Sequence, residues 1–225
     1  MASKPAGRGL IQGVVFDMDG LMFDTEQLSV RAWEQTSRQL GIPIDREFIV
    51  ATLGLNLRNS QRVFQTKLGA SFDYLHARQI KLAYVTAQIE AQGMPLKAGL
   101  LELLDYLRDN RYRMTVATSN EADRTRYYLD KAGIAGYFDR IVTGDMIERG
   151  KPAPDIYLKA CELIDTAPAA CLALEDSPPG IRSASQAGLK AVMIPDLAQP
   201  TEEINRLLFA RLNNLREVIQ LLEEP

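Results

Sequence analysis

Two aspartates, one residue apart, follow a short apolar run near the start of the chain. Asp17 and Asp19 come directly after residues 11–16 (IQGVVF), within the segment DMDGLMFDT. Aspartates are common in turns, but two carboxylates at the end of a buried strand are costly unless they have partners or a task. The pair is therefore a candidate for nucleophilic and acid–base chemistry.

Three further groups of polar residues follow apolar segments later in the chain. They are Thr118, Ser119 and Asn120 after RMTVA, Lys151 in GKPAPDIY, and Glu175 and Asp176 in LEDSPPGI. A helix cap, a solvated loop lysine and an acidic turn are the simpler interpretations of these groups. If they meet, however, four crowded carboxylates need a hard divalent cation such as Mg²⁺, and a lysine with a threonine hydroxyl suits an anion such as phosphate.

The elements that would position these groups alternate along most of the chain. After the strand at residues 11–16, helical periodicity with little strand signal runs from about Gln27 to Gln92. Beyond it, helices alternate with short apolar strands, which is typical of βαβ units and a mainly parallel sheet. We expect strands at 113–117, 140–143, 171–174 and 191–194, and helices at 99–109, 121–132, from 154, from 179, at 201–210 and at 213–222.

This pattern predicts an α/β fold, a doubly wound, Rossmann-like parallel sheet with an inserted helical domain. Residues 1–26 and 93–225 would form the core domain, and residues 27–92 a small helical cap domain. In open parallel sheets, ligands bind beyond the carboxyl ends of the strands. All the polar groups above follow predicted strands or the loops beside them, so we expect them at one edge of the sheet.

Composition excludes several classes of protein. The 225 residues are 46% hydrophobic and 24% charged, which is ordinary for a globular chain, and the net charge of −3 argues against sequence-independent nucleic-acid binding. His76 is the only histidine, so a multi-histidine metal site is impossible, and two cysteines cannot form a disulfide framework. With no signal peptide and no run of about 18 apolar residues, we expect a cytoplasmic monomer without a membrane partner.

The motifs together resemble the haloacid dehalogenase superfamily, in the branch of phosphatases and β-phosphoglucomutase-like proteins with a helical cap. The segment DMDGLMFDT matches its first motif, and Thr118, Lys151 and Glu175-Asp176 follow in the family's order and spacing. The resemblance implies Asp17 as nucleophile, Asp19 as general acid and base, and Thr118, Ser119 and Lys151 as phosphate ligands. It also implies Mg²⁺ held by Asp17, the Asp19 carbonyl and Asp176, with Glu175 bound to it directly or through water.

Three positions differ from the motifs of other branches of the family and limit the reactions to be expected. Asp19 argues against dehalogenases and phosphonatases, which lack this aspartate. Ser29 and Leu53 stand where a mutase would have a histidine and a lysine. A phosphatase acting on a small phosphorylated metabolite, such as a sugar phosphate, is therefore the first expectation. A sugar-phosphate mutase and a non-enzymatic phosphate-binding or signalling module are the alternatives.

Substrate choice should depend on the cap, because the cap closes over the strand ends. The segment at residues 54–59 is the expected contact loop, with Asn56 and Arg58 as candidate substrate residues. Arg58 is equally compatible with a solvated side chain. Asp24 is compatible with a helix cap, with Gln27 completing a capping box, as well as with a part in the motif.

Overall fold

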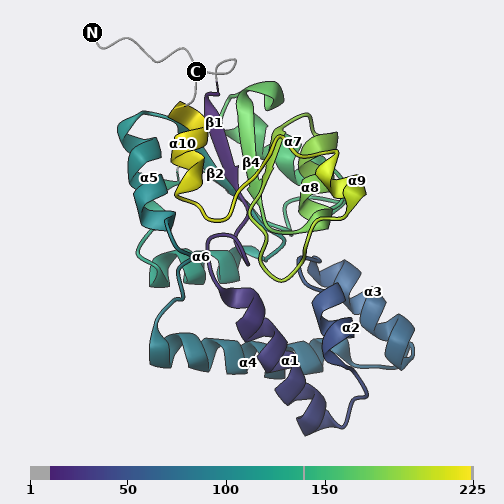
Figure 1. Cartoon of the computed structure of the whole chain (residues 1–225). Helices are drawn as coiled ribbons and strands as arrows, with labels where there is room; N and C mark the ends of the chain where they lie inside the picture. The colour runs from purple at the N-terminus through teal and green to yellow at the C-terminus, as the bar shows by residue number, and fades with distance from the viewer. Residues whose placement is uncertain (1–10, 139, 224–225) are drawn as a thin grey trace.

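A six-stranded parallel sheet forms the centre of the molecule. The computed structural model describes residues 11–138 and 140–223, and the strands lie in the order β3-β2-β1-β4-β5-β6 (Figure 1). The predicted α/β class and parallel sheet are confirmed. The strands are β1 (Gly13–Phe16), β2 (Arg113–Ala117), β3 (Arg140–Val142), β4 (Cys171–Glu175), β5 (Lys190–Met193) and β6 (Ala210–Arg211).

Helices cover both faces of this sheet. Successive side chains of a strand point to opposite faces, and β1 shows this directly: Val14 and Phe16 belong to one buried cluster and Val15 to another. The first cluster includes residues of α5 (Leu100–Asp109), α6 (Ala122–Lys131) and α10 (Glu217–Glu223). The second includes residues of α7 (Asp155–Leu163), α8 (Pro178–Gln186) and α9 (Glu202–Asn205).

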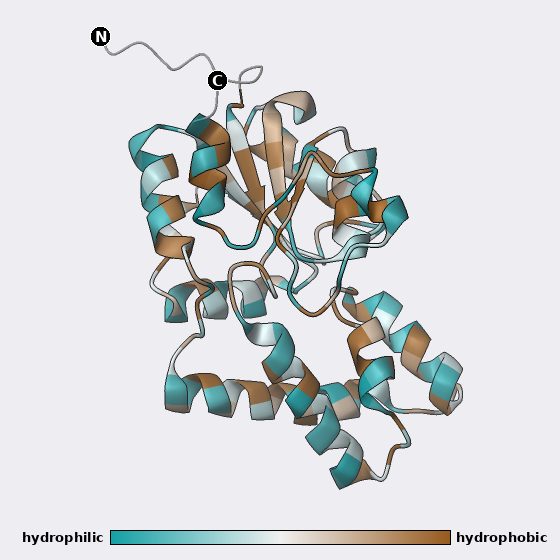
Figure 2. Ribbon diagram, in the orientation of Figure 1, coloured by the Kyte–Doolittle hydropathy of each residue, from teal (hydrophilic) through white to brown (hydrophobic). Residues whose placement is uncertain are grey.

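Four helices follow β1 and lie apart from the sheet (Figure 1). They are α1 (Thr25–Leu40), α2 (Arg46–Ala51), α3 (Leu57–Leu68) and α4 (Tyr74–Gln92). Apolar residues, brown in Figure 2, recur along these helices, and a buried cluster around Trp33, Phe64 and Tyr74 gives this part a small core of its own. The boundaries of the cap domain at residues 27–92 remain a proposal, and so do those of the core domain at residues 1–26 and 93–225. Part of the core domain lies outside the described residues.

Three of these helices have an N-cap residue with a short polar side chain, the type that N-cap positions prefer. Asp45, Asn56 and Asp73 accept hydrogen bonds from the first-turn N–H groups of α2, α3 and α4. Asp24 precedes α1 but makes no capping bond, so the capping box with Gln27 is wrong. Its carboxylate lies 3.5 Å from Lys97 Nζ instead.

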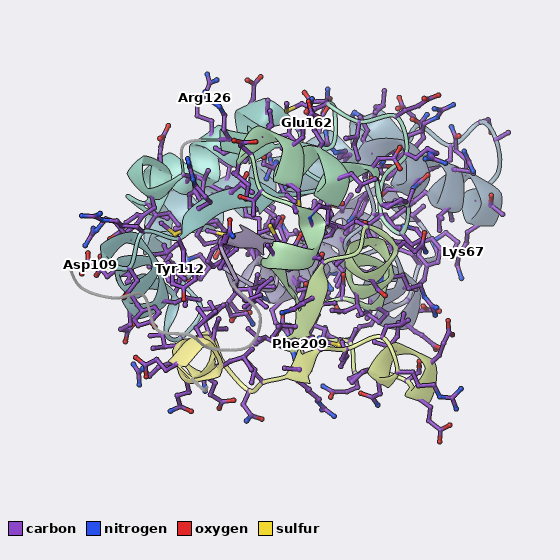
Figure 3. All side chains as sticks on the ribbon, turned by 90° about the horizontal axis from the view of Figure 1, so that it is seen from above. Lys67, Asp109, Tyr112, Arg126, Glu162 and Phe209 are labelled. Atoms are coloured by element: carbon purple, nitrogen blue, oxygen red, sulfur yellow. The ribbon has the colours of Figure 1, made fainter. Side chains whose placement is uncertain are left out.

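The end of the chain differs from expectation. We predicted a helix over residues 201–210, but α9 ends at Asn205 and residues 210–211 form the edge strand β6. Ala210 and Arg211 pair in parallel with Val192 and Met193 of β5, and Phe209 (labelled in Figure 3) donates its N–H to the Ala191 carbonyl at 2.8 Å. Residues 210–211 have only a weak helical pattern, and pairing with the open edge of the sheet at β5 determines their conformation instead. Within the described ranges, no helix is both long and apolar enough to cross a membrane.

Candidate active site

The register of the central strands brings the predicted polar residues to one edge of the sheet. Phe16 of β1 pairs with Val116 of β2 and with Leu174 of β4. The residues that follow these strands therefore meet, and the Asp17 N–H donates to the Leu174 carbonyl at 3.0 Å. The geometry follows from parallel pairing, which aligns carboxyl ends.

Lys151 lies among these strand ends with only 2% of its side chain exposed. Its Nζ is 2.5 Å from Asp17 Oδ1, 2.5 Å from Glu175 Oε1 and 3.1 Å from the Ala117 carbonyl. Burial alone would lower the pKa of Lys151, but the charges of Asp17 and Glu175 outweigh it and raise the pKa above its ordinary value. Lys151 therefore stays a cation beside Asp17.

Both carboxylate oxygens of Glu175 accept hydrogen bonds from other groups of the protein. Besides Lys151, its Oε1 accepts a hydrogen bond from the Tyr157 hydroxyl at 2.7 Å. Its Oε2 accepts from the Ser177 hydroxyl at 3.0 Å and the Ser177 N–H at 3.3 Å. A Cβ at Gly180 would collide with this carboxylate, which explains a glycine there. Glu175 thus orients Lys151 with both of its oxygens engaged.

Asp176 has the opposite character, because its Oδ2 is buried and has no hydrogen-bond partner among the described residues. The residue is 2% exposed, and carboxylate oxygens of Asp17, Glu175 and Asp176 lie within 4.8 Å of one another. Burial and the charges of Glu26 and Asp17 raise the pKa of Asp176 well above its ordinary value. A buried, unpartnered carboxylate oxygen in an acidic cluster fits an oxygen-ligated divalent cation.

Gly20 closes this corner of the site. Its φ of +82° lies in the left-handed region, and a Cβ there would collide with Asp176 Oδ2. Glycine is therefore required both for the turn and for the close approach of the loop to Asp176.

Asp19 is held by two neighbours. Its Oδ1 accepts from the Thr25 hydroxyl and its Oδ2 from the Asn120 side-chain amide, both at 2.5 Å. Thr118 lines the same cavity, and its Oγ1 accepts the Asn120 N–H at 3.1 Å. Asn120 was not among the site residues predicted from the sequence. Its position directly after β2, two residues beyond Thr118, could have indicated that it lies in the site.

Two carboxyl groups respond strongly to burial. Desolvation raises the pKa of Asp17 to about 8, although Lys151 acts in the opposite direction. Desolvation, with the charges of Asp196, Asp19 and Asp17, also raises the pKa of Glu26 to about 8. Glu26 was missed from the sequence because an acidic residue in a helix's first turn is ordinary, and nothing in the spacing indicates its burial.

The cavity extends from these residues to the cap. Ser29 and Leu53, the positions that distinguish mutases, line it, and the Ser119 hydroxyl donates to the Gly54 carbonyl at 2.8 Å. Asn56 caps α3 and lies against Gly150, while Arg58 is exposed; neither lines this cavity. Further lining residues, absent from our sequence-based set, come from α4 and the α6 region: Arg78, Lys81, Glu121, Arg124 and Tyr128.

Known proteins match the chain over most of its length. A family model described as Haloacid dehalogenase-like hydrolase matches residues 14–194. The chain is 30% identical over 183 residues to Fructose-1-phosphate phosphatase YqaB of Escherichia coli (80% of this chain, 94% of that one). It is 29% identical over 188 residues to Beta-phosphoglucomutase of Bacillus subtilis (81% and 82%). The crystal structure of CbbY from Rhodobacter sphaeroides in complex with phosphate matches with a TM-score of 0.80 at 27% identity (93% and 96%).

Proposed function

Since the chain belongs to the haloacid dehalogenase-like hydrolase family, we propose that it is a Mg²⁺-dependent phosphatase of a small phosphorylated metabolite. A sugar phosphate or a similar phosphomonoester is the substrate class, and an aspartyl-phosphate on Asp17 is the intermediate. The observation that carries the proposal is the pairing of Asp17 with a buried Lys151, next to an Asp19 fixed by two hydrogen bonds. The phosphatase and sugar-phosphate names among the relatives support the substrate class.

The reaction proceeds in two displacements. A carboxylate oxygen of Asp17 attacks phosphorus, the bond from phosphorus to the ester oxygen breaks, and Asp19 gives that leaving oxygen a proton. Asp19 then accepts a proton from water, whose oxygen attacks phosphorus and releases Asp17 as a carboxylate with inorganic phosphate. The Thr118 hydroxyl and the Ser119 N–H bind the phosphoryl oxygens. The charge of Lys151, whose three N–H groups donate to Asp17, Glu175 and the Ala117 carbonyl, offsets the charge of the phosphate.

The donor set fits Mg²⁺. Asp176 Oδ2 is buried without a partner in the described structure, so Asp176, Asp17 and the Asp19 carbonyl are the ligands we assign. Glu175 supports the site through Lys151, since both of its oxygens already accept hydrogen bonds. Mg²⁺ supplies positive charge that offsets the repulsion between the Asp17 carboxylate and a phosphate.

The test is release of inorganic phosphate from a panel of phosphorylated metabolites, with Mg²⁺ or EDTA present. We expect Mg²⁺-dependent release that Asp17→Asn abolishes, because an amide cannot form the acyl phosphate. Every sugar phosphate is also examined for isomerisation. Isomerisation without net release would overturn the hydrolase in favour of a mutase, and a stable phosphorylated protein without turnover would favour a signalling module.

A further inference from the structure

Three basic side chains line the same cavity as Asp17 and Lys151. Arg78 and Lys81 come from α4 of the cap, and Arg124 comes from α6 of the core. Helix α4 runs below α6 in Figure 1, and an Arg78–Glu121 ion pair of 2.5 Å joins the two regions. We call Arg78, Lys81 and Arg124 the basic cluster. None of them is used by the reaction proposed above.

The helices that carry the basic cluster bring more positive than negative charge to the cavity. Three cations of the basic cluster face one carboxylate, Glu121, among the lining residues from α4, α6 and the α6 N-cap. Arg78 donates to Glu121, and Arg124 donates to the Tyr128 hydroxyl at 2.8 Å and lies over its ring. Lys81 has no ion pair or hydrogen bond to any residue within the described part of the chain.

Lys81 is in an unfavourable position for an unpaired cation. Burial, together with the charges of Arg124 and Arg78, lowers the pKa of Lys81 to about 7, although Asp19 opposes this. An anion bound beside it would remove the electrostatic penalty and hold Lys81 protonated. The two guanidinium groups keep further N–H donors for the same anion.

We propose that the basic cluster binds a second anionic group of the substrate. This inference rests on the proposed function and narrows it: the preferred substrate is a phosphomonoester that carries a second phosphate or a carboxylate. Its reacting phosphate lies against Asp17 and Lys151 while the other anion contacts Lys81. Arg78, Glu121 and Arg124 also line a second cleft, between α4 and α6.

The test uses linear alkyl phosphates of increasing length that end in a methyl group, a carboxylate or a second phosphate. At the best length, we expect wild-type kcat/KM to be at least about tenfold higher for an anionic end than for a methyl end, as a charge-assisted contact allows. Lys81→Met, which keeps length and helix propensity, should remove most of that ratio, whereas Lys81→Arg should retain it. The carboxylate and phosphate arms show which anion is preferred.

Lys67→Met is the matched control. Lys67 is an exposed lysine on cap helix α3, at the edge of the molecule in Figure 3, and does not line the cavity. It should leave the ratio unchanged. An equal preference for methyl and anionic ends in wild type, or a ratio that survives Lys81→Met, would overturn the inference.

Failure of this inference and failure of the proposed function give different results. If no alkyl phosphate or panel metabolite is hydrolysed, the proposed function fails. The basic cluster is then judged by calorimetric binding of the methyl-ended and phosphate-ended compounds to Asp17→Asn, which needs no turnover. Tighter binding of the phosphate-ended compound that Lys81→Met removes supports the cluster, and equal binding contradicts it.

Discussion

The Tyr157 hydroxyl is fully buried behind the strand ends, where it donates to Glu175 at 2.7 Å. Burial and the neighbouring negative charges raise the pKa of Tyr157 well above its ordinary value, so it remains a donor. Tyr157→Phe removes one of the four hydrogen bonds that Glu175 accepts. We expect a loss of about 1–2 kcal/mol in the free energy of unfolding and a several-fold fall in kcat, because Lys151 loses part of its support.

Urea unfolding and steady-state kinetics measure these effects. Tyr106→Phe is the control, because Tyr106 lies on α5, packs against Tyr112 and is remote from the cavity. It should change neither quantity appreciably. A Tyr157→Phe variant with wild-type stability and kcat would contradict a supporting role for the hydroxyl.

Alanine variants of Gly20 and Gly41 distinguish the cost of backbone strain from the cost of crowding at the site. Both have positive φ, +82° and +64°, so alanine costs about 1–2 kcal/mol at either position. Only at Gly20 would the new Cβ collide with Asp176, whereas nothing lies within 4 Å at Gly41. Gly20→Ala should therefore destabilise the protein more than Gly41→Ala and should also weaken the thermal stabilisation by Mg²⁺. Equal losses in the two variants, with the Mg²⁺ response intact, would argue against close packing at Asp176.

At the scale of elements, the Ser119 hydroxyl joins the core to the cap loop before α3 through a hydrogen bond to the Gly54 carbonyl. Ser119→Ala removes it while leaving the Ser119 N–H in place. We expect KM to rise about three- to tenfold, as the loss of about 1 kcal/mol of cap attachment predicts, with kcat changed less. Ser183→Ala is the matched control, because it removes a buried bond to the Ala153 carbonyl within the core. It should lower stability without raising KM; equal KM values for wild type and Ser119→Ala would refute the attachment.

The elements also show what the sequence could predict. Strands β1, β2 and β4 were identifiable because each is a short apolar run followed by polar residues, and Asp17, Asp19, Thr118 and Asp176 follow directly from that pattern. Strand β6 could not be predicted, because a strand of two residues is too short to show a hydrophobic periodicity. Arg78 and Lys81 lie on the cap helix α4, far in sequence from every motif, and only tertiary packing turns them toward the cavity.

At the scale of the whole molecule, the buried carboxyl groups link stability to pH and to the cation. Burial raises the pKa of Asp17 and of Glu26 to about 8, and raises that of Asp176. In the metal-free folded protein these groups therefore keep protons at pH values where the unfolded chain, with carboxyl pKa values near 4, has released them. The unfolded state binds fewer protons, so the free energy of unfolding falls as pH rises from about 5 to 8.

Other groups do not reverse this sign. Lys81, with a pKa lowered to about 7, acts in the opposite direction near neutrality, but it is one group against three. The pKa of Lys151 is raised, so it is protonated in both states over this range. Exposed acids with lowered pKa values, such as Glu90 and Glu102, are ionised in both states above pH 5.

Mg²⁺ should therefore stabilise the protein more at about pH 8 than at about pH 5.5, because it binds the ionised carboxylates and competes with protons for them. Melting temperatures with EDTA should fall across this range, and with Mg²⁺ the fall should be smaller. Glu26→Gln should flatten the EDTA profile, since an amide does not titrate. A metal-free melting temperature that rises with pH, or a Mg²⁺ gain that is larger at pH 5.5, would show that these carboxylates are not protonated in the folded protein and that burial does not govern their charge.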